Sequence, residues 1–327
     1  MELTAHPFQR LGAYAAAELL GRSCPSEIAE PDLGTLAGVI AGHAQMAGTA
    51  EKGGRGWAWL LQLAPMFPQA PPTHPSRVKA LRRIDERVVE FLMEPDDPGS
   101  ATPCWACGRP ATPRWSKSLW PLAEPAREIN NSRDRLPGVP VCRWCRVAVW
   151  CLPYAVAFSR GRIIHVESTD EVEEAWARSN TRLSLEAIRD GWADWAEGTD
   201  PFHAILDVIR PSGAGALISL WVNDNRPVKT RMTRWQLSAA GSAWLIVALE
   251  RGYGPLLERL ALVKPRRTHL LFLAMEDDEE LWDRVGAMPS PGPYLPLISA
   301  LRAACWNPSL ATVREALSPR PQPLHVG

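Results

Sequence analysis

Apolar residues recur at helical spacing along the first hundred residues of the chain. An Ala-rich stretch covers 8–20 and ends at Gly21, and a second stretch covers 33–46, just after Pro31, a residue favoured in the first turn of a helix. A third stretch, 78–91, repeats large apolar residues at the same spacing within an Arg-rich segment. The pattern predicts three helices, the last with an apolar face and a basic face.

Beyond residue 150 the pattern mixes strand and helix signals. Residues 161–166 predict a strand, and Ser168 to Glu171 have the sequence of a capping box that opens a helix containing Trp176. A second helical pattern extends to Trp195, and 214–222 predicts another strand. That strand is followed by the Asn-rich loop 223–227 and the basic segment 229–235. From residue 237 onward the pattern is helical again and predicts a C-terminal helical bundle.

Composition and charge narrow the class of protein. The 327 residues favour one large or two modest domains, and 46% hydrophobic with 22% charged residues are typical of a folded chain. The net charge is zero, which argues against a protein that binds nucleic acid alone through an overall basic surface. No apolar stretch approaches the roughly 20 residues of a membrane span, and no secretory signal is visible at the start. We therefore expect a cytoplasmic location without a membrane.

Basic residues are almost all arginine: five lysines leave 31 arginines among the 36 basic residues. Arginine suits bidentate contacts with phosphate and guanine, although a GC-rich genome produces the same bias without any function. Fifteen tryptophans are also unusual, and most of them are expected in the core or at subunit interfaces.

Four of the seven cysteines form two Cys-x-x-Cys pairs separated by 34 residues. The pairs are Cys104 with Cys107, which Gly108 follows directly, and Cys142 with Cys145. We call these two segments the first and second knuckle, because each pair makes a tight turn that points two thiolates at one ion. The spacing predicts one closed tetrahedral zinc site with a structural role. A redox dithiol would need only one pair in a thioredoxin-like setting, and four thiolates leave no open position for a catalytic zinc.

The sequence therefore predicts an α+β protein with a helical N-terminal part, a zinc-knuckle module with an irregular insertion, a small sheet and a C-terminal helical bundle. We expect a recognition domain over 1–235, with the zinc module at about 100–150, and the bundle over 236–327. The insertion, 110–140, is rich in Pro, Arg, Asn and Trp and shows no sustained period.

The order of motifs resembles one known family. Leu3-Thr4-Ala5-His6-Pro7-Phe8, followed by Gly12, is similar to the N-terminal Thr-Gly-His-Pro-Phe motif of the large subunit of type I-B CRISPR Cascade effector complexes, in its short zinc-containing variant. Ala5 replaces the usual glycine. Helices, a Cys-x-x-Cys-Gly-Arg knuckle, an Asn-containing insertion, a second knuckle and Leu152-Pro153 then follow in the family's order. The resemblance covers at least the N-terminal half of the chain.

This resemblance implies a DNA-recognition subunit of an RNA-guided complex. Such subunits bind near the 5′ end of the CRISPR guide RNA, recognise a short protospacer-adjacent motif in target duplex DNA and assist duplex opening, while base pairing reads the target. The implied partners are the guide RNA, the target duplex and the other Cascade subunits, namely the backbone, guide 5′-end and small subunits. The implied role is not enzymatic.

Two Asn- and Arg-containing segments are the candidate nucleic-acid contacts. Asn pairs well with adenine edges, and Arg with guanine or phosphate, but Asn and Asp are also good turn residues, so turn chemistry accounts for the composition equally well. The candidates are Asn130, Asn131 and Arg133 in the insertion, Asn223, Asn225 and Arg226 after the second predicted strand, and Arg231 and Arg234 in the basic segment.

Two other classes of function remain open. In a zinc-stabilised protein–protein adaptor, the tryptophans would anchor partners and nucleic acid would have no direct role. A hydrolase would have to use scattered histidines and carboxylates, and the sequence contains no Walker loop, dinucleotide fingerprint, nucleophile elbow or zinc-protease motif. His165 and His269 are read as core or edge residues, and the acidic run 276–280 as a solvated helix start. We therefore expect no enzymatic activity.

Overall fold

A computed structural model of the chain describes twelve segments and single residues: 1–49, 56, 66–67, 70, 83–97, 102–116, 119–120, 136, 138–159, 162–192, 218–225 and 230–237. Strand residues 158–159, 162, 218–225 and 230–237 are described by their backbone alone. The chain divides into two compact units, and the side chains discussed below belong to the first, which comprises Met1–His165, Glu173–Thr199 and Trp221–Thr233. The helical bundle predicted for 236–327 lies outside the described residues, apart from two strand residues at its start.

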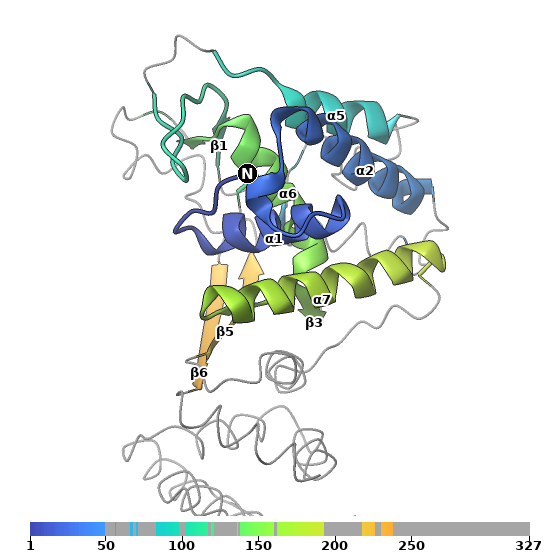
Figure 1. Cartoon of the computed structure of the whole chain (residues 1–327), viewed down its shortest axis with the longest axis vertical. Helices are drawn as coiled ribbons and strands as arrows, with labels where there is room; N and C mark the ends of the chain where they lie inside the picture. The colour runs from blue at the N-terminus through green and yellow to red at the C-terminus, as the bar shows by residue number, and fades with distance from the viewer. Residues whose placement is uncertain are drawn as a thin grey trace, which may run out of the picture. The chain divides into compact units, whose positions relative to one another are not determined.

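The described part is helical with small antiparallel pairings, consistent with the α+β class (Figure 1). Its helices are α1 (Pro7–Leu19), the single 3₁₀ turn η1 (Pro25–Glu27), α2 (Glu30–Thr49), α5 (Ile84–Met93), α6 (Arg143–Ala155) and α7 (Asp170–Arg189). None of these helices is both long and apolar enough to cross a membrane.

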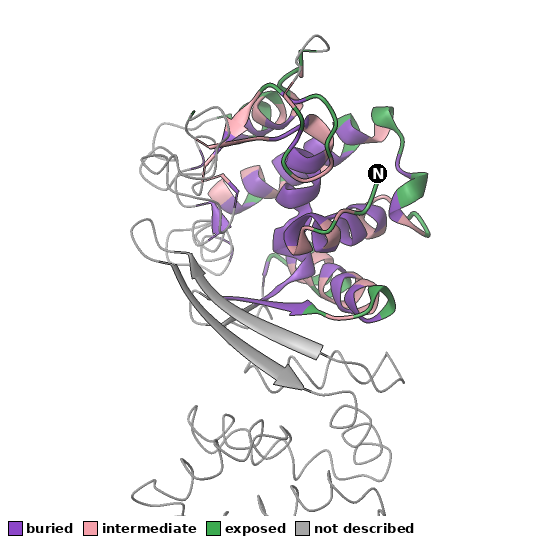
Figure 2. Cartoon of the chain, turned by 90° about the vertical axis from the view of Figure 1, so that its left-hand side faces the viewer, coloured by how far each residue is buried: buried purple, intermediate pink, exposed green. Residues whose placement is uncertain are grey.

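Among the described helices, α1 and α6 share the most extensive packing contact, and Figure 2 shows buried residues gathered among the helices. Four alanines of α1, from Ala13 to Ala17, are fully buried together with Leu11, so this helix presents small side chains to its neighbour. Gly12 lies where the two helices cross: a Cβ atom on it would come within 1.9 Å of the Ala148 carbonyl oxygen. The absence of a side chain at Gly12 therefore sets the distance between α1 and α6.

An aromatic chain joins α6 to α5 and to the knuckle region. The rings of Trp150 in α6 and Phe91 in α5 have centroids 5.4 Å apart, and Phe91 stacks on Trp115 at 5.2 Å. Trp115 belongs to strand β1 (Arg114–Trp115), which pairs antiparallel with β2 (Val139–Pro140). Large aromatic areas buried in this way contribute strongly to stability, so the two ends of the insertion are held against the helical core.

Four further strands follow in one sheet with the order β3-β4-β5-β6. Strand β3 (Ala157–Ser159) pairs antiparallel with β4 (Arg162–Glu167), and Phe158 is opposite Ile163. Strands β5 (Ile218–Asn225) and β6 (Thr230–Leu237) complete the order. The sheet begins directly where α6 ends, so the second knuckle, α6 and the first hairpin are consecutive parts of one segment.

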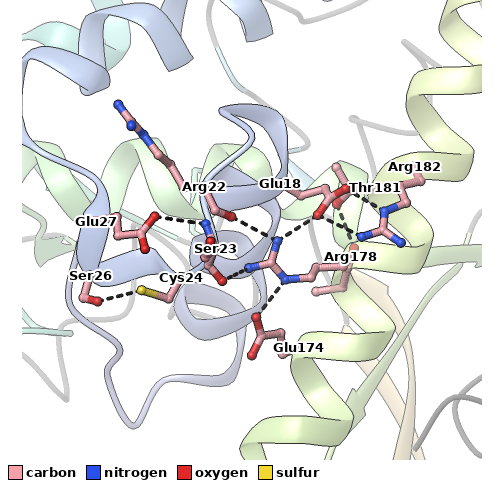
Figure 3. A network of polar contacts seen from close by, with 11 residues as sticks. Glu18, Arg22, Ser23, Cys24, Ser26, Glu27, Glu174, Arg178, Thr181 and Arg182 are labelled. Carbon is pink, nitrogen blue, oxygen red and sulfur yellow. Dashed lines mark hydrogen bonds and ion pairs between the residues drawn. The ribbon is translucent and has the colours of Figure 1, made fainter.

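Charged contacts fix α7 to the end of α1, as Figure 3 shows. The Arg178 guanidinium lies 2.8 Å from Glu18 and 2.7 Å from Glu174, and it also donates to the carbonyl oxygens of Arg22 and Ser23. Arg182 adds a second contact to Glu18 at 2.6 Å. Partial burial alone would raise the pKa of Glu18, but the hydrogen bonds from Arg182 and Arg178 hold this pKa below its ordinary value.

Several sequence predictions agree with the elements and others need correction. The predicted helices at 8–20 and 33–46 correspond to α1 and α2, and the capping-box sequence, Ser168 to Glu171, spans the start of α7. Residues 170–189 form one continuous helix, not two. Helix α6 was not predicted, because the second knuckle was interpreted as a turn and Pro153 suggests an interruption. Pro153 lies inside α6 and removes one helical hydrogen bond, the one that its N–H would have donated to the Val149 carbonyl oxygen.

Adding one methyl group at Gly12 tests the packing of α1 on α6. We expect Gly12→Ala to lower the free energy of unfolding by about 1–3 kcal/mol, because the new Cβ forces the helices apart. Gly34→Ala in α2 is the matched control: no atom lies within 4 Å of its Cβ position. The control should gain about 0.5–1 kcal/mol, since alanine favours a helix over glycine. Thermal melts of both variants and of the unaltered chain measure these changes. If Gly12→Ala is as stable as the unaltered chain or more stable, the crossing of α1 and α6 is not tightly packed.

Candidate metal centre

The first knuckle is a tight turn closed by backbone hydrogen bonds. The N–H of Gly108 donates to the carbonyl oxygen of Cys104 at 2.9 Å, and the N–H of Cys104 donates to that of Arg109 at 2.6 Å. Gly108 has a φ of +77°, a conformation that glycine adopts without steric strain. The N–H of Arg109 also donates to the Cys107 sulfur. The glycine after the second cysteine therefore shapes the turn, as its position in the sequence suggested.

The second knuckle is built on the beginning of helix α6. Cys142 is the residue just before the helix, and Cys145 lies in its first turn. The N-terminal end of a helix carries a partial positive charge, which favours nearby thiolates. The backbone N–H of Cys142 donates to the Cys104 sulfur, so the second knuckle also contacts the first directly.

The four cysteine sulfurs form one compact cluster. All four Sγ atoms of Cys104, Cys107, Cys142 and Cys145 lie within 4.8 Å of one another, and those of Cys107 and Cys142 are 3.4 Å apart. All four cysteines are free thiols in the structure. Sulfur ligands at about 2.3 Å from a tetrahedral ion would lie about 3.8 Å from each other, so the cluster has the right size for a metal such as zinc.

Hydrogen bonding within the cluster separates the pKa values of the thiols. Thiol hydrogen bonds from the other cysteines lower the pKa of Cys104, and those from Cys142 and Cys145 lower the pKa of Cys107. Hydrogen bonds with Cys104 and Cys107 raise the pKa of Cys142 and Cys145, and burial and the charge of a neighbouring sulfur raise it further. Four thiolates at this spacing repel one another strongly, and a divalent cation at their centre removes that repulsion.

A buried arginine ties the cluster to the helical core. Arg146, four residues after Cys142, is fully buried and donates to the carbonyl oxygens of Leu92, Glu94 and Val141 and to the carboxylate of Asp96. Burial lowers the pKa of Arg146, and Asp96 opposes that effect. Asp96 also accepts the backbone N–H of Arg143 at 2.7 Å, so its carboxylate caps the start of α6.

Arg146 and Asp96 were not among the residues predicted from the sequence. A charged residue directly before the apolar segment 147–152 of the same helix was the available signal for Arg146. Nothing in the sequence pairs it with Asp96, because the contact crosses 50 positions of the chain.

His6 joins the N-terminal motif to the first knuckle. Its Nε2 accepts the indole N–H of Trp120 at 3.0 Å, and its ring centroid lies 5.0 Å from that of Trp105 and 4.9 Å from that of Trp120. The two tryptophan rings are themselves 5.7 Å apart. Burial lowers the pKa of His6 to about 4, so the ring is neutral at physiological pH and can accept this hydrogen bond.

The candidate nucleic-acid residues are only partly described. Asn130, Asn131, Arg133 and Arg226 lie outside the described residues. Asn223 and Asn225 do not lie in a loop as predicted: both belong to strand β5, and Arg231 and Arg234 belong to β6. The Asn-rich composition was interpreted as a turn, but pairing within the sheet overrides such local preferences.

The remaining histidine and carboxylate candidates have the following places. His165 lies in β4 and is buried against Phe8 with a centroid distance of 4.7 Å, in agreement with the core role expected for it. Burial and the neighbouring His6 lower its pKa to about 3. His269 and the acidic run 276–280 lie outside the described residues.

Comparison with protein-family models, curated proteins and solved structures finds no match to this chain.

Acid should destabilise the fold through His6. Its pKa is about 4 when folded against about 6.5 for an exposed histidine, so the unfolded chain binds more protons between these values and stability falls as the pH drops through this window. From pH 7 to pH 5.5 the loss from this one group is about 1 kcal/mol. The Gln side chain of His6→Gln can still accept the hydrogen bond from the Trp120 indole N–H, but it does not titrate. The loss of unfolding free energy between pH 7 and pH 5.5 should therefore be smaller in this variant by about 1 kcal/mol. Chemical unfolding at both pH values measures it; an identical pH dependence in the variant would contradict the assignment.

Proposed function

We propose that Cys104, Cys107, Cys142 and Cys145 hold one zinc ion with a structural role. Four thiolates form the ligand set typical of structural zinc, and they fill its tetrahedral coordination, so that no position remains for water or substrate. Two further features support this role: the first knuckle is hydrogen-bonded to β2 through the Trp105 N–H and the Pro140 carbonyl oxygen, and three of the four cysteines are buried. When bound, the zinc supplies cross-linking of the two knuckles and no reaction chemistry.

Removing one ligand tests this proposal. We expect one zinc per chain by elemental analysis, and we expect Cys107→Ser to lose that zinc together with much of its thermal stability, because metal binding of this kind is part of the folding free energy. Cys24→Ser is the matched control, since Cys24 is a partly exposed thiol outside the cluster. The control should keep both zinc and stability. Full zinc content or an unchanged melting temperature in Cys107→Ser would refute the proposal.

We further propose that the chain is a DNA-recognition large subunit of an RNA-guided CRISPR Cascade complex. One observation carries this proposal: the motifs that resemble the family, far apart in the sequence, meet in space. His6 packs against Trp105 of the first knuckle, Gly12 packs against α6, and α6 carries the second knuckle. Residues that only happened to resemble a family would not be expected to form one connected unit.

In this role the subunit would read a protospacer-adjacent motif and help to open the duplex. Asn side chains of the insertion and of β5 would contact base edges, and Arg231 and Arg234 would contact phosphates. Base-edge contacts set sequence preference, whereas phosphate contacts strengthen binding to all sequences. The zero net charge fits a subunit whose partners supply much of the attraction for phosphate.

A zinc-stabilised protein–protein adaptor is the second candidate function. The Trp105 side chain, which is 50% exposed, favours it, because tryptophan is enriched among the residues that contribute most to protein interfaces. In that case nucleic acid would have no direct role.

Purification of the tagged full chain from cells that express its neighbouring genes separates the two functions. We expect guide RNA and a repeated backbone subunit to co-purify with the chain. Cys107→Ser serves as the comparison and should lose both, because its knuckle region cannot fold without metal. A single protein partner without RNA would favour the adaptor, and would contradict the proposed role in an RNA-guided complex.

A further inference from the structure

Trp105 is both exposed and fixed in place. Its ring forms T-shaped contacts with His6 and Trp120, at centroid distances of 5.0 and 5.7 Å and at interplanar angles of 61° and 79°. Its backbone N–H donates to the Pro140 carbonyl oxygen at 2.9 Å, so the main chain is held as well. Half of the side chain is still open to solvent. An aromatic ring that its neighbours already hold in place loses little conformational freedom when another flat group stacks on its exposed part.

A second flat group lies in the same pair of knuckles. The Arg109 guanidinium, just after the first knuckle, lies 5.0 Å from the ring centroid of Trp144, which sits inside the second knuckle. Arg109 also faces Glu2 at 3.7 Å, but both side chains are exposed, at 43% and 66%. Exposed ion pairs of this kind contribute little to stability, so a phosphate could replace Glu2 at small cost.

We propose that Trp105 and Arg109 form a binding platform for an unpaired stretch of RNA, with a base stacked on Trp105 and a phosphate on Arg109. Unpaired RNA is commonly held by aromatic rings and arginine planes, because its bases are free to stack on them. This inference rests on the proposed function, in which guide RNA is a resident partner, and it names the side chains that would hold that RNA.

The surroundings of Trp105 favour RNA over the two other occupants. Duplex DNA keeps the faces of its bases covered by stacking, so it offers nothing for Trp105 to stack on. A protein partner would need a wider apolar surface around the tryptophan. Among the described residues that flank the first knuckle in the chain, the exposed ones are Pro103, Gly108, Arg109 and Pro110, and the charged Arg109 stands among them.

Binding of a fluorescein-labelled 12-nucleotide oligouridine to the purified full chain tests the platform. We expect Trp105→Ala to weaken binding at least about fivefold, while Trp105→Phe, which keeps an aromatic face, retains most of the affinity. Arg109→Gln should reduce the slope of log Kd against log salt by about 0.7, the value for one lost phosphate contact on a single strand. Leu183→Ala is the matched control, because Leu183 is a comparably exposed apolar residue on α7, at 59%, and should change nothing.

Zinc content and melting temperature are measured for each variant to show that it is folded. If Trp105→Ala does not fold, Trp105→Leu, which keeps an apolar side chain without an aromatic face, takes its place and is compared with Trp105→Phe. An unchanged oligouridine affinity in folded Trp105→Ala would overturn the platform, as would binding of oligodeoxythymidine but not of oligouridine. Loss of a protein partner from the complex with unchanged RNA affinity would assign the surface to protein and overturn it too. The proposed function is judged separately, by whether the unaltered chain co-purifies with guide RNA.

Discussion

Repulsion among four clustered thiolates is the constraint around which the described part of the chain is arranged. The Sγ atoms lie within 4.8 Å of one another, and they come from segments on either side of a long insertion. Without a cation at their centre, four thiolates at this spacing would repel one another strongly. With one, the start of α6, the β1–β2 pair and the first knuckle become a single rigid piece. Arg146 and Asp96 extend that piece to the end of α5.

The N-terminal helix depends on the same piece. Gly12 lets α1 lie directly against α6, and His6 contacts the first knuckle through Trp105. These contacts explain in physical terms why a histidine, a proline and a glycine near the start of the chain accompany two distant cysteine pairs. His6 serves as a neutral acceptor for the Trp120 indole, and Pro7 opens α1. His6 is neutral at physiological pH and has a fixed partner in Trp120, so its role in this site is structural.

Patterns between residues close in the sequence predicted the cysteine cluster and the amphipathic helices, because nearby residues determine these features. The cysteine spacing identified all four members of the cluster, and helical periodicity identified α1, α2 and the apolar side of α5. Helix α6 was missed because cysteines and a proline interrupt its pattern, although buried apolar residues from Val147 to Leu152 stabilise it by packing. The environment of His6 could not be predicted, since Trp120 lies 114 positions away. Asn223 and Asn225 were misplaced for a related reason: strand pairing outweighed their preference for turns.

X-ray absorption at the zinc edge tests the central claim most directly, because it reports the atoms around the metal in the intact chain. The account predicts a single shell of four sulfur atoms at about 2.3 Å from zinc, with no nitrogen or oxygen ligand. Among the described residues, Cys104, Cys107, Cys142 and Cys145 are the one group of four clustered side chains that could supply such a shell. A mixed shell containing nitrogen or oxygen at about 2.0 Å would contradict it, because the site would then be open and its ligands would include residues other than these four.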